Sequence, residues 1–86
     1  MKIQIDPHTL QQMDERDISE DEIVDVLSKG INFQAKRGRM GKYKVFTYGK
    51  KRDRKFYKHK RVEVIYVEEE GIIVTVTAYA FYGEWE

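Results

Sequence analysis

Three polar residues that could do chemistry, His8, Gln12 and Arg16, recur every four residues and therefore share one stripe of a helix. His8 falls in the first turn of that helix, where the dipole disfavours imidazolium and free backbone N–H groups can receive a phosphate. A neutral imidazole beside a phosphate is what a general base for attack by a ribose 2′-hydroxyl requires. The stripe points away from Leu10 and Met13, which we expect to face the core. A solvated polar helix face is the alternative interpretation.

The middle of the chain is strongly basic. Residues 36–61 hold thirteen Lys or Arg and one acid, Asp53. Residues 1–35 hold eight acids and three bases, and residues 62–86 hold six acids and no base. Five aromatic residues are interleaved with the cations of the middle segment: Tyr43, Phe46, Tyr48, Phe56 and Tyr57. Because Lys and Arg neutralise phosphates and aromatic faces stack on unpaired bases, this composition favours a single-stranded nucleic acid as the partner.

Two other partners suit the same charge. The basic segment can face the acidic helices and acidic tail of its own chain, or an acidic protein can cover it. RNA is favoured because the excess of positive charge in residues 36–61 exceeds what either acidic segment alone can neutralise. The residues of this segment that we expect to bind RNA are Lys50, Lys51, Arg52, Arg54, Lys55 and Tyr57.

Several kinds of chemistry have no support in the sequence. Cysteine is absent, which excludes disulfides, thiol catalysis and thiolate metal sites, and His8 and His59 are too few imidazoles for a structural zinc site. There is no Walker loop, no GxGxxG element and no serine nucleophile elbow. We therefore expect no metal and no cofactor. No membrane span or signal peptide is recognised, and the absence of cysteine suits the cytoplasm.

Two short helices are expected at the start of the chain. Asp6 is typical of an N-cap and precedes a helix over 7–16. Ser19 begins a capping box, and a second helix follows to about Ser28. Gly30 is expected to end this helix in a left-handed conformation.

After the second helix the hydrophobic period changes from 3.6 to 2 residues. Strands are expected at four places: 31–35, 43–48, 61–68 and 72–81. Residues 49–59 show no apolar rhythm and are expected to form a basic loop, whereas a strand over 2–5 is too short to predict. The 86 residues are thus expected to form a single α+β domain, with two N-terminal helices packed on one face of a four-stranded antiparallel sheet.

The last two strands are expected to pair through a tight turn at 70–71, which sets Tyr66 opposite Thr75 and Val64 opposite Thr77. One face of the pair then carries small aliphatic side chains that fit against the helices. The other face carries hydroxyls and aromatic rings: Val62, Val64, Tyr66, Thr75, Thr77, Tyr79 and Phe81. This uncovered face is a candidate platform for RNA bases. A half-exposed face of ordinary strand formers is the alternative, and a slip of one residue exchanges the faces.

The opening of the chain resembles a known family. The run His-x4-Met-x-x-Arg-x-Ile-Ser-x-x-Glu-Ile-x-x-Val-Leu over 8–27 looks like the start of the domain-of-unknown-function family 4258, and 62–66 and 73–79 resemble its last two strands. That family resembles the RelE-like and barnase-like ribonucleases in its layout. The resemblance implies a small, metal-independent endoribonuclease, often a toxin neutralised by an antitoxin-like protein, with cleavage that leaves a cyclic phosphate.

The resemblance also implies roles for particular residues. His8 and Arg16 match the family's His and Arg, and Thr77 and Tyr79 match its terminal strand. The chain departs from the pattern at two positions: Gln12, where the family commonly has a basic residue, and Asp17, where it usually has glycine. The loss of one cation weakens the catalytic interpretation without removing a role in binding.

Three functions are therefore considered. The first is an endoribonuclease of the RelE-like toxin type that acts on single-stranded RNA. His8 would be the general base or acid, Arg16 would stabilise the charged phosphorane, and Tyr79 would position a base. The second is a non-catalytic module that binds single-stranded or ribosome-associated RNA. The third is a protein-interaction domain, either a homodimer or bound to an acidic partner, that uses Tyr66, Thr77 and Tyr79.

Overall fold

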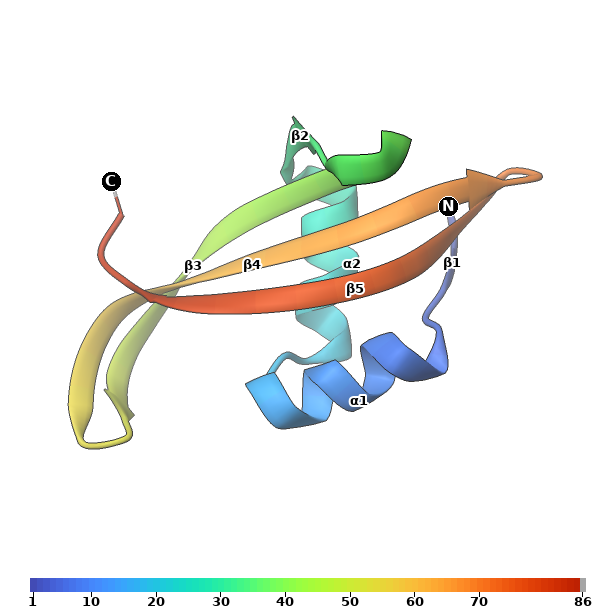
Figure 1. The fold of residues 1–86 in the computed structure, drawn as a ribbon. Helices are drawn as coiled ribbons and strands as arrows, with labels where there is room; N and C mark the ends of the chain where they lie inside the picture. The colour runs from blue at the N-terminus through green and yellow to red at the C-terminus, as the bar shows by residue number, and fades with distance from the viewer. Residues whose placement is uncertain (86) are drawn as a thin grey trace.

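The computed structural model describes residues 1–85 and places two helices on one side of a five-stranded sheet (Figure 1). In chain order the elements are β1 (Lys2–Gln4), α1 (Pro7–Arg16), α2 (Glu20–Lys29), β2 (Ile31–Gln34), the short 3-10 turn η1 (Lys36–Gly38), β3 (Met40–Arg52), β4 (Lys55–Glu69) and β5 (Ile72–Gly83). Across the sheet the strands follow the order β1-β5-β4-β3-β2. The predicted α+β class is confirmed.

The sheet is mixed rather than purely antiparallel. β1 runs parallel to β5, with Lys2 opposite Ile72 and Gln4 opposite Val74, whereas the other neighbouring strands are antiparallel. The prediction of four antiparallel strands is therefore wrong, because it omits β1, a fifth and parallel strand. Three residues are too few to show a two-residue hydrophobic period, so β1 is defined only by its pairing with the distant β5.

Both helices begin at the side-chain caps that the sequence predicts. The Asp6 carboxylate accepts hydrogen bonds from the Thr9 backbone N–H at 3.1 Å and from the Thr75 hydroxyl at 3.2 Å. Burial acts to raise the pKa of Asp6, but these hydrogen bonds outweigh it and hold the pKa below its ordinary value. Ser19 and Glu22 form a reciprocal capping box at the start of α2. Neither helix within residues 1–85 is long and apolar enough to span a membrane.

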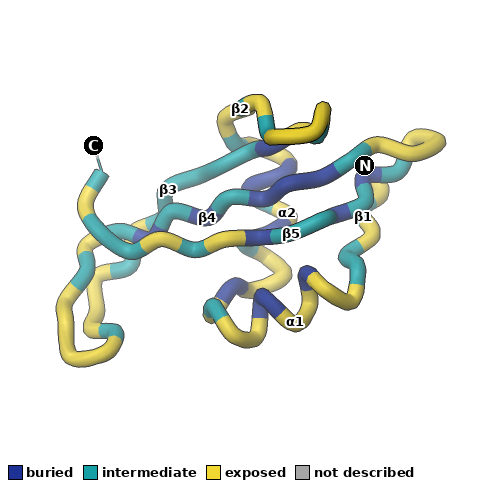
Figure 2. The backbone as a smooth tube through the Cα atoms, in the orientation of Figure 1, coloured by how far each residue is buried: buried dark blue, intermediate teal, exposed yellow. Residues whose placement is uncertain are grey.

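The core lies between α2 and the centre of β4 and β5. Ile23, Val26 and Leu27 of α2 are fully buried, as are Val62 and Val64 of β4. Figure 2 shows buried segments in the middle of the sheet and on the inner sides of both helices, with exposed backbone at the two ends of the sheet. Burying an aliphatic side chain of this size stabilises the fold by about 1.5–3 kcal/mol, so α2 is firmly attached to the sheet.

A β-bulge in β5 changes which side chains face the helices. Tyr66 lies opposite Thr75, as predicted, but Ile65 lies opposite Thr77, because Val76 is an extra residue on β5. An extra residue reverses the alternation of side chains along the rest of the strand relative to its partner. The predicted pairing of the strands is therefore correct near the turn and wrong beyond the bulge.

The faces of the sheet consequently differ from the prediction. Four residues expected on the uncovered face are buried on the helix side instead: Val62, Val64, Tyr66 and Thr75. The other three lie on the side away from the helices, as predicted: Thr77, Tyr79 and Phe81. We call the side of the sheet that the helices do not cover the open face.

α1 packs through polar side chains, contrary to the expectation that Gln12 points away from the core and Leu10 toward it. Leu10 is exposed and Gln12 is buried. Gln12 Oε1 accepts hydrogen bonds from the Ala78 backbone N–H at 2.9 Å and from the Thr77 hydroxyl at 2.6 Å, and Arg16 Nη1 donates to the Ala78 carbonyl at 2.6 Å. Because β1 covers only the first residues of β5, α1 supplies the partners that a neighbouring strand would give to this edge.

β3 and β4 continue beyond the rest of the sheet as a hairpin. The prediction of a loop over 49–59 is wrong, because strand pairing continues to Arg52 opposite Lys55. Asp53 and Arg54 form the turn, with positive φ values of 53° and 70° that suit the tightest hairpins. A bulge on β3 precedes this end, and the hairpin curls toward the side that carries the helices (Figure 1). Charged side chains on both sides of the two strands remove the apolar alternation that would have predicted them.

Asp17 ends α1 in the left-handed conformation, with φ of 56°, which glycine adopts at the least cost. We therefore expect Asp17→Gly to raise the free energy of unfolding by up to about 1 kcal/mol. The ion pair of its carboxylate with Arg52, at 3.9 Å, is exposed and contributes little. Urea denaturation of the two proteins measures the difference. A loss of stability of more than about 1 kcal/mol would mean that the position requires the side chain of Asp17 rather than its backbone conformation.

Candidate nucleic-acid interface

The densest positive charge lies on the part of the hairpin that projects from the sheet, residues 50–58, which we call the hairpin tip (Figure 2). Five of its cations are exposed and form no ion pair with any described residue: Lys50, Lys51, Arg54, Lys55 and Lys58. The ammonium groups of Lys50 and Lys55 lie 4.9 Å and 5.5 Å from the ring centroids of Tyr48 and Tyr57. The hairpin tip thus combines exposed, unpaired positive charge with aromatic surface.

Two cations of β3 and β4 outside the hairpin tip are paired with acids. Lys44 of β3 donates a hydrogen bond to Asp25 of α2, and this bond lowers the pKa of Asp25 below its ordinary value. Arg61 Nε of β4 lies 2.8 Å from Glu63 Oε2. Lys44 and Arg61 are therefore paired with acids, whereas the five exposed cations of the hairpin tip are not paired with any described residue.

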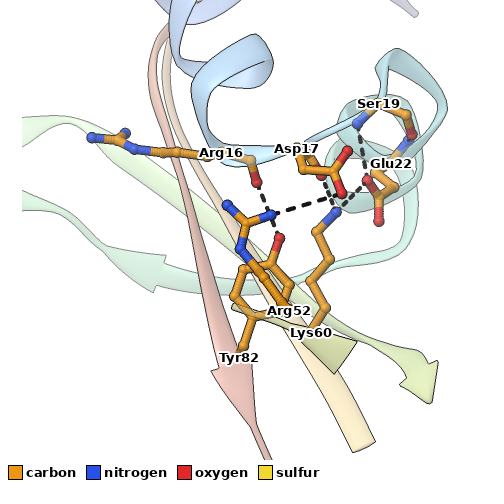
Figure 3. Close-up of polar contacts among 7 residues, drawn as sticks. All are labelled: Arg16, Asp17, Ser19, Glu22, Arg52, Lys60 and Tyr82. Carbon is orange, nitrogen blue, oxygen red and sulfur yellow. Dashed lines mark hydrogen bonds and ion pairs between the residues drawn. The ribbon is translucent and has the colours of Figure 1, made fainter. Parts of the chain in front are cut away.

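A buried lysine fixes β4 to the junction between the helices (Figure 3). Lys60 is 4% exposed, and its ammonium donates hydrogen bonds to the Asp17 carbonyl and, at 2.9 Å, to Glu22 Oε1. The same Glu22 atom accepts the capping bond from the Ser19 backbone N–H. Lys60 is thus held by groups from the end of α1 and the start of α2, which leaves it no part in binding a ligand at the surface.

The base of the hairpin tip packs around Tyr82 in the same cluster (Figure 3). The Arg52 guanidinium lies 4.7 Å from the Tyr82 ring centroid, and the Tyr57 ring lies 5.7 Å from it. Burial raises the pKa of Tyr82, and its hydroxyl donates to the Arg16 carbonyl at 3.1 Å. Of the residues predicted to bind RNA, Arg52 and Tyr57 are therefore half-buried supports, whereas the other four of the hairpin tip point to solvent.

Aromatic rings and a guanidinium lie on the open face. The rings of Tyr79 and Phe81 are 6.3 Å apart at an interplanar angle of 27°, and both are well exposed. Thr77 precedes them on the same side of β5. The Arg61 guanidinium lies 3.7 Å from the ring centroid of Tyr43. Such surfaces can stack on unpaired bases.

Tyr66, predicted to contact RNA, is not on this surface. Its side chain is 2% exposed in the core on the helix side, and burial raises the pKa of its hydroxyl. The prediction fails because of the bulge at Val76, which separates the face of Tyr66 from that of Tyr79. Thr77 and Tyr79 remain accessible from the open face.

Two of the three residues predicted to be catalytic come together. The Arg16 guanidinium lies 5.1 Å from the centroid of the Tyr79 ring while its Nη1 bonds to the Ala78 carbonyl. His8 is exposed in the first turn of α1, at the opposite end of the helix. The helical rise separates the backbones of His8 and Arg16 by about 12 Å. The imidazole and the guanidinium therefore belong to different ends of α1.

The sequence does not predict two further features. Lys36, Arg37 and Arg39 surround η1 beside the open face, and three cations within four residues are the signal that could have marked them. His59 Nδ1 accepts a hydrogen bond from the Trp85 backbone N–H at 3.0 Å. This bond joins residues far apart in the chain and has no local signal.

Comparison with known proteins finds one family. The model of the family described as "Domain of unknown function (DUF4258)" matches residues 5–79, from just before α1 into β5. No curated protein and no solved structure matches the chain.

Proposed function

This chain belongs to the family described as "Domain of unknown function (DUF4258)", and from the chemistry of its surface we propose that it binds single-stranded RNA. The observation that carries the proposal is the sorting of charge on β3 and β4. Lys44, Lys60 and Arg61 are paired with acids, whereas the five exposed cations of the hairpin tip have no ion-pair partner within residues 1–85. Unpaired Lys and Arg gain most from a polyanion, because releasing its counterions drives association.

A single strand suits this surface better than a duplex. The exposed rings of Tyr79 and Phe81 on the open face can stack only on bases that are not already stacked and paired. Each base–aromatic contact contributes about 1–3 kcal/mol and tolerates different sequences. With charge at the hairpin tip and aromatic surface on the open face, the chain is expected to bind single-stranded RNA with a weak sequence preference.

The experiment neutralises two exposed cations of the hairpin tip. We expect Lys51→Gln/Arg54→Gln to weaken binding to an unstructured RNA about tenfold. The slope of log affinity against log salt should fall by about 1.4, because each lost phosphate contact removes about 0.7. Fluorescence anisotropy across a salt series measures both quantities.

The matched control is Lys2→Gln/Lys29→Gln, which removes the same net charge from exposed positions away from the hairpin tip. It should change affinity less than about twofold, a loss of less than about 0.4 kcal/mol. An equal loss in both double variants would mean that binding follows net charge alone, and the hairpin tip would then have no special role.

A second candidate function is metal-independent cleavage of the bound RNA. It is favoured by the contact between Arg16 and Tyr79, which puts a guanidinium and a phenol together at the edge of the open face. Under this proposal RNA is cleaved in EDTA, and Tyr79→Phe lowers the cleavage rate by about 100-fold while affinity changes little. His8→Ala reports separately on the imidazole. An absence of cleavage across a broad panel of RNA substrates would leave binding as the function.

A further inference from the structure

A hollow on the open face lies beside η1. η1 is the green turn before β3 in Figure 1, at the end of the sheet away from the hairpin tip. Its volume of about 490 Å³ is within the range of roughly 300–1,000 Å³ typical of small-molecule sites. The floor is formed by side chains of the sheet: Phe33, Ile65, Thr77 and Tyr79. The rim is formed by three cations around η1: Lys36, Arg37 and Arg39.

The rim is positively charged without any compensating acid. None of its three cations forms an ion pair in the described part of the chain, and no Asp or Glu lines the hollow. The Ala35 N–H donates to the Arg39 carbonyl at 3.2 Å, and the Arg39 N–H donates to the Lys36 carbonyl at 3.3 Å. These two bonds close a small loop that keeps the cations together. Guanidinium groups gathered in this way suit the oxygens of a phosphate.

The floor combines aromatic surface with a free acceptor. The Phe33 ring lies over Gly41, where a Cβ atom would come within 2.5 Å of it, and Tyr79 is 37% exposed. The Thr77 hydroxyl donates its proton to Gln12 Oε1, so its oxygen is left to accept a hydrogen bond from a ligand. A planar base with an amino group can pack on the rings and donate to this oxygen.

We propose that this hollow holds one unpaired nucleotide of the RNA strand, with its base against Phe33 and Tyr79 and its phosphate against Arg37 and Arg39. The inference rests on the proposed RNA binding and adds a defined position within it. A mononucleotide free in solution has the same chemistry, and the experiment below separates the two sources.

The open face connects this hollow to the hairpin tip. The path along β4 from Ile65 at the hollow to Tyr57 at the hairpin tip is about 25 Å long at the rise of an extended strand. On this path the acid Glu63 of β4 lies directly opposite Tyr79 of β5. Its carboxylate accepts a hydrogen bond from Arg61 Nε at 2.8 Å, so its negative charge is already paired. A strand of several nucleotides can therefore contact both groups of cations at once, which favours RNA over a free mononucleotide.

The test uses RNA containing thiouridine, cross-linked by light and mapped by mass spectrometry of the protein. We expect cross-links on the peptides that contain Phe33 and Tyr79. Arg37→Gln/Arg39→Gln should reduce their yield at least fivefold under saturating RNA. In the hairpin variant Lys51→Gln/Arg54→Gln the overall affinity should fall while the cross-linked positions stay the same. Circular dichroism of both variants checks that the substitutions leave the fold intact.

Each outcome separates this inference from the proposed function. Cross-links confined to the hairpin tip would overturn the nucleotide site while RNA binding stands. An absence of binding by the unmodified chain would overturn both. Uridine monophosphate alone, followed by NMR shifts, should bind far more weakly than RNA. If it perturbs Phe33 and Tyr79 with an affinity equal to that of RNA, the hollow takes a free nucleotide and the assignment to an RNA strand is wrong.

Discussion

Replacing Gly30 with alanine is expected to lower the free energy of unfolding by about 3 kcal/mol or more. A Cβ atom at this position would lie 2.3 Å from the Val26 carbonyl oxygen and 2.8 Å from the Tyr43 carbonyl oxygen. Both contacts are with backbone, so a rotamer change cannot relieve them. The end of α2 would have to move away from β3, and the packing of α2 against the core would be lost with it.

The control is Gly38, a position that favours glycine because of its backbone conformation and not because of a close contact. Gly38 has φ of 70°, and a Cβ atom added to it would meet no other atom within 4 Å, so Gly38→Ala should cost about 1–2 kcal/mol from the left-handed backbone alone. Gly30 has φ of −70°, which any residue adopts. Urea denaturation compares the two variants. If Gly30→Ala is no less stable than Gly38→Ala, the close contact of Gly30 with the Val26 and Tyr43 carbonyl oxygens is not the reason that position 30 requires glycine.

Gly30 also shows which features of the fold a local sequence pattern can predict and which it cannot. The caps at Asp6 and Ser19 are confirmed because each acts on a backbone N–H three residues away, within one turn of helix. The predicted left-handed ending at Gly30 is wrong, because its φ is −70°. A Cβ atom there would meet the carbonyl oxygen of Val26 in the same helix and also that of Tyr43 in β3. The position of such a residue depends on the tertiary fold, and a local pattern contains no information about it.

The same distinction explains the mistaken sheet face. The run from Ile72 to Tyr79 alternates without a glycine that would mark the bulge at Val76, and one extra residue exchanges the faces beyond it. Tyr66 follows the alternation of β4 and is buried on the helix side with Val62 and Val64. Thr77 and Tyr79 lie on the open face because they follow the bulge.

The sequence also does not show which of the basic residues are paired with acids in the fold. The sequence predicts that residues 36–61 are basic, but Lys60 and Lys51 both belong to this segment and cannot be told apart by composition. Pairing with acids from α2 separates them, since Lys60 contacts Glu22 whereas Lys51 is exposed and has no ion-pair partner among the described residues. Tertiary contacts therefore separate the cations that hold the fold from those that we propose to bind RNA.

Lys60→Ala is expected to cost about 3 kcal/mol of stability, the second large effect. The substitution leaves the Asp17 carbonyl and the Glu22 carboxylate without the ammonium that both contact, and it removes the buried stem of the side chain (Figure 3). Because Glu22 is partly exposed and can regain water, we expect the lower end of the range for broken buried pairs. Urea denaturation measures the loss.

Lys60→Met separates charge from packing, since it keeps most of the stem and should cost about half as much. A double-mutant cycle with Glu22→Gln should give a coupling of about 1–2 kcal/mol. RNA affinity should stay within about twofold of the unmodified chain, because Lys60 Nζ is already occupied inside the protein. Lys51→Gln/Arg54→Gln should show the opposite behaviour, with weaker RNA binding and unchanged stability. If Lys60→Met weakened RNA binding as much as that hairpin variant while stability stayed constant, the division of these cations into structural and ligand-binding groups would be wrong.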